Sequence, residues 1–153
     1  MKKLLKGLLA FAIVLVITGC GTGNEDNAKA KDLSEVKIGV IQLMQHDALD
    51  ASYKGFKDEL VKAGINADNI DYQVAGDQSN CTTVADKLVN GGNDLIYAIA
   101  TPALQAVAAA TTEIPIVGCA VTDYESTKLV KSNDKPGGNV TGASDLTPVE
   151  DQF

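Results

Sequence analysis

The chain has 153 residues, which is enough for one domain of ordinary size and too few for two. Hydrophobic residues make up 45% of it and aromatic residues only 5%, so a core has to be built from valine, isoleucine, leucine and alanine. The formal net charge of -7 argues against a nucleic-acid-binding protein, which normally presents a basic surface.

The first residues have the pattern of a bacterial export signal. A lysine-rich start is followed by an aliphatic run over residues 8–18, which is too short to cross a bilayer, since that takes about 20 residues. The order Ile17-Thr18-Gly19-Cys20 resembles a lipobox, in which the cysteine is lipidated and becomes the new N-terminus. The alternatives are a plain signal peptide or a membrane anchor, with a coincidental cysteine at this position.

This pattern predicts a lipoprotein signal peptide over residues 1–19 and a lipid anchor on Cys20. A diacylglycerol anchor is sufficient for stable membrane attachment. We therefore expect the protein to be exported and held on the outer side of the cytoplasmic membrane. Residues 20–35 contain almost nothing to bury and are expected to form a flexible tether, so the domain is expected to span residues 36–145.

Strand and helix patterns alternate through this domain. In chain order, the sequence predicts a strand over 36–43, a helix over 49–64, a strand over 70–74, a helix over 81–90, a strand over 94–100, a helix over 101–111, a strand over 116–121, a short helix over 124–131 and a strand over 139–144. Aliphatic strands that alternate with amphipathic helices indicate an α/β fold. We expect a three-layer, open parallel sheet with helices on both faces and strand order 2-1-3-4-5.

In such a sheet, ligands bind beyond the carboxyl ends of the strands. The loop after the third strand is the most informative, because Thr101 is a natural N-cap and Pro102 suits a first helical residue. The Thr101 hydroxyl and the Ala103 amide are then placed to hold a carboxylate, while Asp123 and Asp145 on neighbouring loops could neutralise an ammonium group. The alternative is a capped helix beside ordinary turns.

Catalytic and metal-binding patterns are missing from the sequence. It contains neither a Gly-x-Ser-x-Gly elbow nor a glycine-rich phosphate loop, and its single histidine, His46, makes a poor metal site. We expect a protein that is not an enzyme and that needs no cofactor or metal. Cys81 and Cys119 fall on apolar positions and are expected in the core; a disulfide between them is left open by their spacing.

Several blocks of the sequence, in order, resemble one family. After the lipobox come KIGVIQLMQHDALDASYKGFKDEL, GDQSN, DLIYAIATPALQA, IPIVGCAVTD and KPGGNVTGASDLTPVE. These blocks look like the ABC-transporter substrate-binding lipoproteins of the tryptophan/tyrosine-binding type. The resemblance implies the type I periplasmic-binding fold, in which two lobes capture a small ligand, such as an aromatic amino acid, and deliver it to a membrane permease.

The resemblance also implies a set of ligand contacts on the first lobe. Carried over block by block, they are His46, Asp50, Gln78, Ser79, Asn80, Thr101, Pro102, Ala103, Thr122, Asp123, Ser144 and Asp145.

Members of this family are about twice as long as this chain, in keeping with two lobes. Residues 146–153 are therefore expected to be a hinge crossing and the cut-off start of a second lobe, which makes the chain an N-terminal fragment. One lobe leaves a ligand open to water, so weak or absent binding is expected. The alternative is a self-contained flavodoxin-like surface lipoprotein that acts as an interaction or sensor module; a surface enzyme is the least supported choice.

Overall fold

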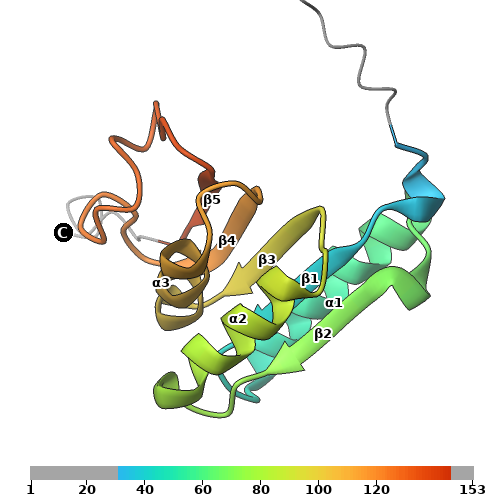
Figure 1. Cartoon of the computed structure of the whole chain (residues 1–153). Helices are drawn as coiled ribbons and strands as arrows, with labels where there is room; N and C mark the ends of the chain where they lie inside the picture. Colours follow the sequence, from blue (N-terminus) through green and yellow to red (C-terminus); the bar gives the residue numbers. More distant parts are fainter. Residues whose placement is uncertain (1–30, 146–153) are drawn as a thin grey trace, which may run out of the picture. The chain divides into compact units, whose positions relative to one another are not determined.

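Five parallel strands form the centre of the computed structural model, which describes residues 31–145 (Figure 1). They are β1 (Ile38–Gln42), β2 (Ile70–Val74), β3 (Leu95–Ile99), β4 (Ile116–Val121) and β5 (Val140–Ser144). Their order across the sheet is β2-β1-β3-β4-β5, which confirms the predicted topology. The predictions for residues 1–30 and 146–153, including the lipidated Cys20 and the start of a second lobe, lie outside the described residues.

Helices cover both faces of the sheet, as predicted. They are α1 (Asp47–Lys62), α2 (Cys81–Asn90) and α3 (Thr101–Ala110). Figure 1 shows α2 and α3 in front of the sheet and α1 behind it. This division follows from the strand order: the chain moves from β1 outward to β2 and then back across to β3 and β4, and right-handed crossovers in opposite directions fall on opposite faces.

The central strands β1 and β3 are buried on both sides and separate two hydrophobic clusters, whereas the edge strands β2 and β5 are more exposed. Ile41 and Ile96 pack with α2 and α3, whereas Val40 and Tyr97 pack with α1. Phe56 of α1 stacks on Tyr97 with ring centroids 3.9 Å apart. Alternate residues of one strand thus serve different helices, which explains why these strands are continuously aliphatic rather than alternating with polar residues.

Three short 3₁₀ turns complete the regular structure: η1 (Leu33–Glu35), η2 (Ala67–Asn69) and η3 (Gln78–Asn80). The first belongs to residues that the sequence assigned to the tether. Lys31 forms an ion pair with Asp94 at 2.6 Å, and the Asn69 amide donates to the Ser34 carbonyl at 2.8 Å. Within residues 31–145 no helix is long and apolar enough to cross a membrane.

The helix predicted over residues 124–131 is wrong, because that segment forms turns. Polar side chains compete there for the backbone: the Ser126 hydroxyl donates to the Asp123 carbonyl, and the Thr127 hydroxyl donates to the Tyr124 carbonyl. Lys128 has a φ of 60°, which interrupts any helix. The segment reaches the sheet through Tyr124, which is 4% exposed.

Tyr124 replaces a helix over β4 and β5. Its hydroxyl donates to the Ala143 carbonyl at 3.3 Å. The Tyr124 side chain lies directly against the backbone of Gly118 and Gly142, because glycine has no side chain in the way. Burial raises the pKa of Tyr124 to about 12, with smaller contributions from Cys119 and Asp145. One aromatic ring therefore closes the core at the β5 side of the sheet.

The disulfide that the sequence left open is not formed, since Cys81 and Cys119 are both free. Cys81 is 1% exposed and belongs to the cluster beneath α2 and α3, as expected of a core residue. Cys119 is only half-buried and packs at the margin of the cluster on the α1 face. Burial, and secondarily the charge of Asp77, raises the pKa of the Cys81 thiol.

Replacing Gly142 by alanine is expected to lower the free energy of unfolding by about 1–3 kcal/mol, because a Cβ there collides with the Tyr124 hydroxyl and the Gly118 carbonyl. Gly55→Ala is the matched control: a Cβ there meets nothing within 4 Å, and the substitution should stabilise α1 by about 0.5–1 kcal/mol. Urea unfolding of both variants measures the difference. An unchanged Gly142→Ala midpoint contradicts the packing of Tyr124 on β5.

Candidate functional site

The carboxyl ends of all five strands lie level along one edge of the sheet, which we call the rim. Gln42 at the end of β1 is paired with Val74 on one side and with Ile99 on the other. Beyond the strands, the backbone continues the ladder from Leu43 to Ile99 at 3.3 Å and from Asp145 to Val121 at 3.2 Å. The loops that carry the predicted contacts are therefore brought together, as the strand pattern predicted.

The loop after β3 differs from its predicted geometry at the helix start. Thr101 is the first helical residue rather than the N-cap, and Ala100 takes the cap position without a side-chain hydrogen bond. Ala100 has φ 85° and ψ 150°, a strained conformation for a residue with a Cβ. Pro102 lies in the first turn, as expected.

The strained Ala100 sets the direction in which α3 leaves the sheet. The Ala100 amide donates to the Cys119 carbonyl at 2.9 Å, and its own carbonyl accepts the first helical hydrogen bond, from Leu104, at 3.0 Å. The amides that precede Leu104 have no acceptor within the helix, which makes this helix end suited to an anion. Among the described residues, the Thr101 hydroxyl forms no hydrogen bond with the protein, so it remains available to a ligand.

The loops after β4 and β5 are joined to each other. A bulge in β4, with Ala120 at φ 53°, shifts the register between Gly118 and Val121 at the rim. The Ser144 hydroxyl donates to the Thr122 carbonyl at 2.6 Å. Asp123 holds a turn, because its Oδ1 accepts from the amides of Glu125 and Ser126, which is the local role that the sequence left as the alternative.

Hydrogen bonds within the loop after β2 engage most of its polar side chains. Asp77 Oδ1 accepts from the Ser79 hydroxyl at 2.6 Å and from the Asn80 amide at 3.1 Å, and these bonds lower the pKa of Asp77. The Asn80 side chain donates to the Ala75 carbonyl at 3.1 Å. Gln78 begins the turn and is exposed. Of the predicted contacts here, Ser79 and Asn80 thus shape the loop, and Asp77 is an organising residue that the prediction omitted.

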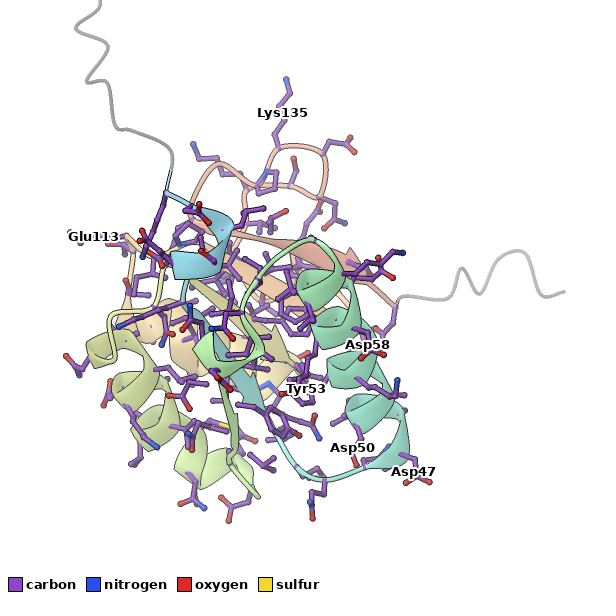
Figure 2. All side chains as sticks on the ribbon, turned by 90° about the vertical axis from the view of Figure 1, so that its right-hand side faces the viewer. Asp47, Asp50, Tyr53, Asp58, Glu113 and Lys135 are labelled. Atoms are coloured by element: carbon purple, nitrogen blue, oxygen red, sulfur yellow. The ribbon has the colours of Figure 1, made fainter. Side chains whose placement is uncertain are left out.

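His46 and Asp50, at the end of β1, are both engaged with the protein. His46 is the N-cap of α1, and its Nδ1 accepts from the Ala48 amide at 3.2 Å. Asp50 Oδ1 accepts from the Gln42 side chain at 2.5 Å. Figure 2 shows Asp50 near the rim end of α1, with Glu113 at the far end of the domain.

Gln42 organises this end of the rim and was not among the predicted contacts. It has 0% exposure, and besides Asp50 its Nε2 donates to the Met44 carbonyl at 2.8 Å, while its Oε1 accepts from the Tyr72 hydroxyl at 3.0 Å. Tyr72 stacks on Tyr53 with centroids 3.8 Å apart, and Figure 2 shows Tyr53 between α1 and the sheet. A glutamine that ends an otherwise aliphatic strand was the available signal, because a buried amide needs partners.

The same network affects ionisation beside the rim. Burial, and then the negative charge of Asp50, raises the pKa of Tyr72. The hydroxyl therefore stays protonated and remains a donor to Gln42 at neutral pH. Within residues 31–145 no group of three histidine, cysteine, aspartate or glutamate side chains is placed to hold a metal ion.

A separate pocket of about 170 Å³ lies beside β5. Its lining residues are Tyr124, Val130, Asn133, Pro136, Thr141, Gly142 and Ser144. Only Ser144 belongs to the predicted contacts, so the pocket adjoins the rim at that residue and otherwise lies beside it.

Comparison with known proteins decides the family. The model of the ABC transporter substrate binding protein family matches residues 37–153. The chain belongs to this family. Its members are in general not enzymes.

A curated relative supports the assignment. The tyrosine-binding protein of Clostridioides difficile (strain R20291) is 41% identical over 159 aligned residues, which cover 97% of this chain and 46% of that protein. This chain thus spans about half the length of that relative.

Solved structures agree on the fold. A protein from Streptococcus pneumonia in complex with L-Trp has a TM-score of 0.71 and 46% identity, over 76% of this chain and 40% of that one. A ligand-free, open substrate-binding protein with adhesive properties from Clostridium difficile has a TM-score of 0.73 and 43% identity, over 75% of this chain and 40% of that one. The family and the lobe fold predicted from the sequence are confirmed.

Gln42→Leu is expected to lower the free energy of unfolding by about 1–3 kcal/mol, since it leaves the Tyr72 hydroxyl without its acceptor and removes both donor bonds of the amide. Gln105→Leu, at an exposed position on α3, is the control and should stay within about 0.5 kcal/mol of the parent. Chemical denaturation of both variants provides the comparison. Equal stability of the two would show that the buried network contributes nothing.

Proposed function

We propose that this chain supplies one lobe of a binding site for a small amino acid with an aromatic side chain, such as tryptophan or tyrosine. The observation that carries the proposal is the level rim, which gathers the strand-end loops and the N-terminus of α3 at one edge. Relatives named for tyrosine binding or crystallised with L-Trp support the ligand class.

In this proposal, the end of α3 takes the ligand's carboxylate. The Thr101 hydroxyl and the Ala103 amide are the donors, and the partial positive charge of the helix end adds to the attraction. Asp123 and Asp145 face the ammonium group; only one oxygen of Asp123 is used by the turn amides. The remaining proposed contacts are His46, Asp50, Gln78, Ser79, Asn80, Pro102, Thr122 and Ser144.

A second lobe is required to enclose the ligand. The chain covers 46% of the curated relative, and the lobe described here presents the rim as one edge of a sheet. A two-lobed receptor closes about a hinge and excludes water from its ligand, whereas one lobe leaves half of the ligand solvated. In the complete receptor, we propose, the closed form delivers the amino acid to a membrane permease of an ABC importer.

Amide chemical-shift mapping tests the site. On adding L-tryptophan or L-tyrosine to the full chain in detergent, we expect shifts at Thr101, Ala103, Asp123 and Asp145, with a dissociation constant weaker than micromolar. N-acetyl-tryptophanamide, which lacks both charges, is the matched control ligand and should leave these amides unchanged. Thr101→Val should lower the affinity for tryptophan about fivefold, because a charge-assisted hydrogen bond is lost.

Two results contradict the proposal. An absence of rim shifts at millimolar tryptophan removes the assigned site. Calorimetry that returns a micromolar or tighter constant for this chain removes the requirement for a second lobe.

We also propose that the protein is exported and anchored by a lipid on Cys20, with residues 1–19 as signal peptide, residues 20–35 as tether and the domain as the extracytoplasmic part. The lysine-rich start, the short aliphatic run and the Ile17-Thr18-Gly19-Cys20 order support this.

Cys20→Ser is expected to abolish lipid labelling and to move the protein from the membrane fraction to the soluble exported fraction or to leave it as uncleaved precursor. Fractionation after metabolic labelling with a fatty acid measures both. Cys81→Ser is the control, since a buried thiol in α2 has no role in anchoring. Lipid labelling that persists in Cys20→Ser would refute the anchor.

A further inference from the structure

Met44 is an exposed hydrophobic side chain in the middle of a polar rim. It is 42% exposed, and among the described residues the other large hydrophobics exposed to this degree are Leu33 and Val61. Those two lie in η1 and in the last turn of α1, away from the strand-end loops. Met44 alone of the three lies within a rim loop.

The position of Met44 is the point where the strand order reverses. The chain leaves β1 toward β2 through α1 on one face, and it leaves β3 toward β4 through α3 on the other face. Ligands of open α/β sheets bind at such a point. The hydrogen bond from the Leu43 amide to the Ile99 carbonyl, at 3.3 Å, places the Met44 loop beside the strand that leads into Thr101.

The backbone of Met44 is fixed by a buried side chain. Its carbonyl accepts from Gln42 Nε2 at 2.8 Å, and Gln42, which has 0% exposure, is itself held by Asp50 and Tyr72. The neighbouring Leu43 packs against the core. The exposure of Met44 therefore belongs to an anchored loop, and a thioether held in water at a rim is a ready partner for an apolar group.

We propose that Met44 determines the specificity of the site, as the apolar surface on which the ring of an aromatic amino acid packs. This rests on the proposed function: the end of α3 takes the carboxylate, and Met44 covers the ring. Methionine suits this role because its thioether makes favourable contacts with aromatic rings and its unbranched chain adapts to rings of different size. The preference for aromatic over small ligands then comes from the burial of Met44 against the ring. The charged groups of the ligand contribute affinity but no preference, because all amino acids carry them.

Methyl NMR tests this directly in the full chain. Methionine occurs only at Met1 and Met44, so protein labelled with ¹³C at the methionine methyl group gives at most two signals, and Met1 serves as the internal control. L-Tryptophan should move the Met44 methyl signal upfield through the ring current and leave Met1 unchanged. L-Alanine, which carries the same charged groups without a ring, should leave the Met44 methyl signal in place.

The amide signals of Thr101 and Ala103, recorded in the same titration, separate this inference from the proposed function. If both amides and the Met44 methyl respond to tryptophan, the proposal is supported. If the amides respond and the methyl does not, the rim binds the ligand but Met44 is not its ring surface. If nothing responds, the proposed function fails, and the role of Met44 fails with it.

Substitution provides the second measurement. Met44→Gln should reduce the preference for tryptophan over alanine roughly three- to tenfold, whereas Met44→Leu should retain most of it. Val61→Gln changes an equally exposed hydrophobic residue away from the rim and should leave the ratio unchanged. An equal loss of affinity for both ligands in Met44→Gln would indicate a structural effect and would overturn the proposal.

Discussion

The parallel register of the five strands is the constraint on which the rest of the structure depends. Because Gln42 is level with Val74 on one side and Ile99 on the other, the loops that follow these strands leave the sheet at the same edge. Main-chain hydrogen bonds fix this register, and the aliphatic side chains above and below make a slip costly, since it would exchange the residues that face α1 with those that face α2 and α3. A ligand site shared between distant segments follows from this alignment.

Two buried side chains with polar groups, those of Gln42 and Tyr124, help to organise this framework. Burying a polar group costs free energy unless it is hydrogen-bonded. Gln42 is a fully buried amide, and its burial is tolerable because hydrogen bonds to β2, to α1 and to the loop after β1 satisfy it. Tyr124 closes the opposite side of the sheet, where an apolar ring over two glycines takes the place of a helix. Strain at Ala100 and the bulge at Ala120 lie between them, at the ends of neighbouring strands. Bulges and strained residues of this kind redirect the backbone at the end of a strand, and they often occur beside functional sites.

Membership of the substrate-binding family gives this arrangement its meaning. The relatives with solved structures match about three quarters of this chain with about two fifths of their own length, so the described domain corresponds to one portion of those proteins. The rim of one lobe holds polar donors on α3, carboxylates on the loops after β4 and β5, and an apolar methionine at the reversal point. The proposed ligand, with a carboxylate, an ammonium group and an aromatic ring, offers one partner to each of these three kinds of group.

The sequence by itself determined the fold class, the strand order, the edge at which the loops gather and the family, because aliphatic periodicity and helix breaks are local signals that survive without knowledge of contacts. It did not determine that Thr101 is the first residue of α3 rather than its N-cap, that residues 124–131 form turns, or that Asp50 accepts a hydrogen bond from the buried Gln42. Part of this depends on partners in other strands: the Cys119 carbonyl holds the strained Ala100, Gly118 and Gly142 admit the ring of Tyr124, and Tyr72 completes the bonding of Gln42. The turns at residues 124–131 are instead formed by local hydrogen bonds from Ser126 and Thr127. Secondary-structure propensity can be read from the local sequence. The hydrogen-bond partners of a buried polar group are known only from the tertiary structure, because they come from separate strands.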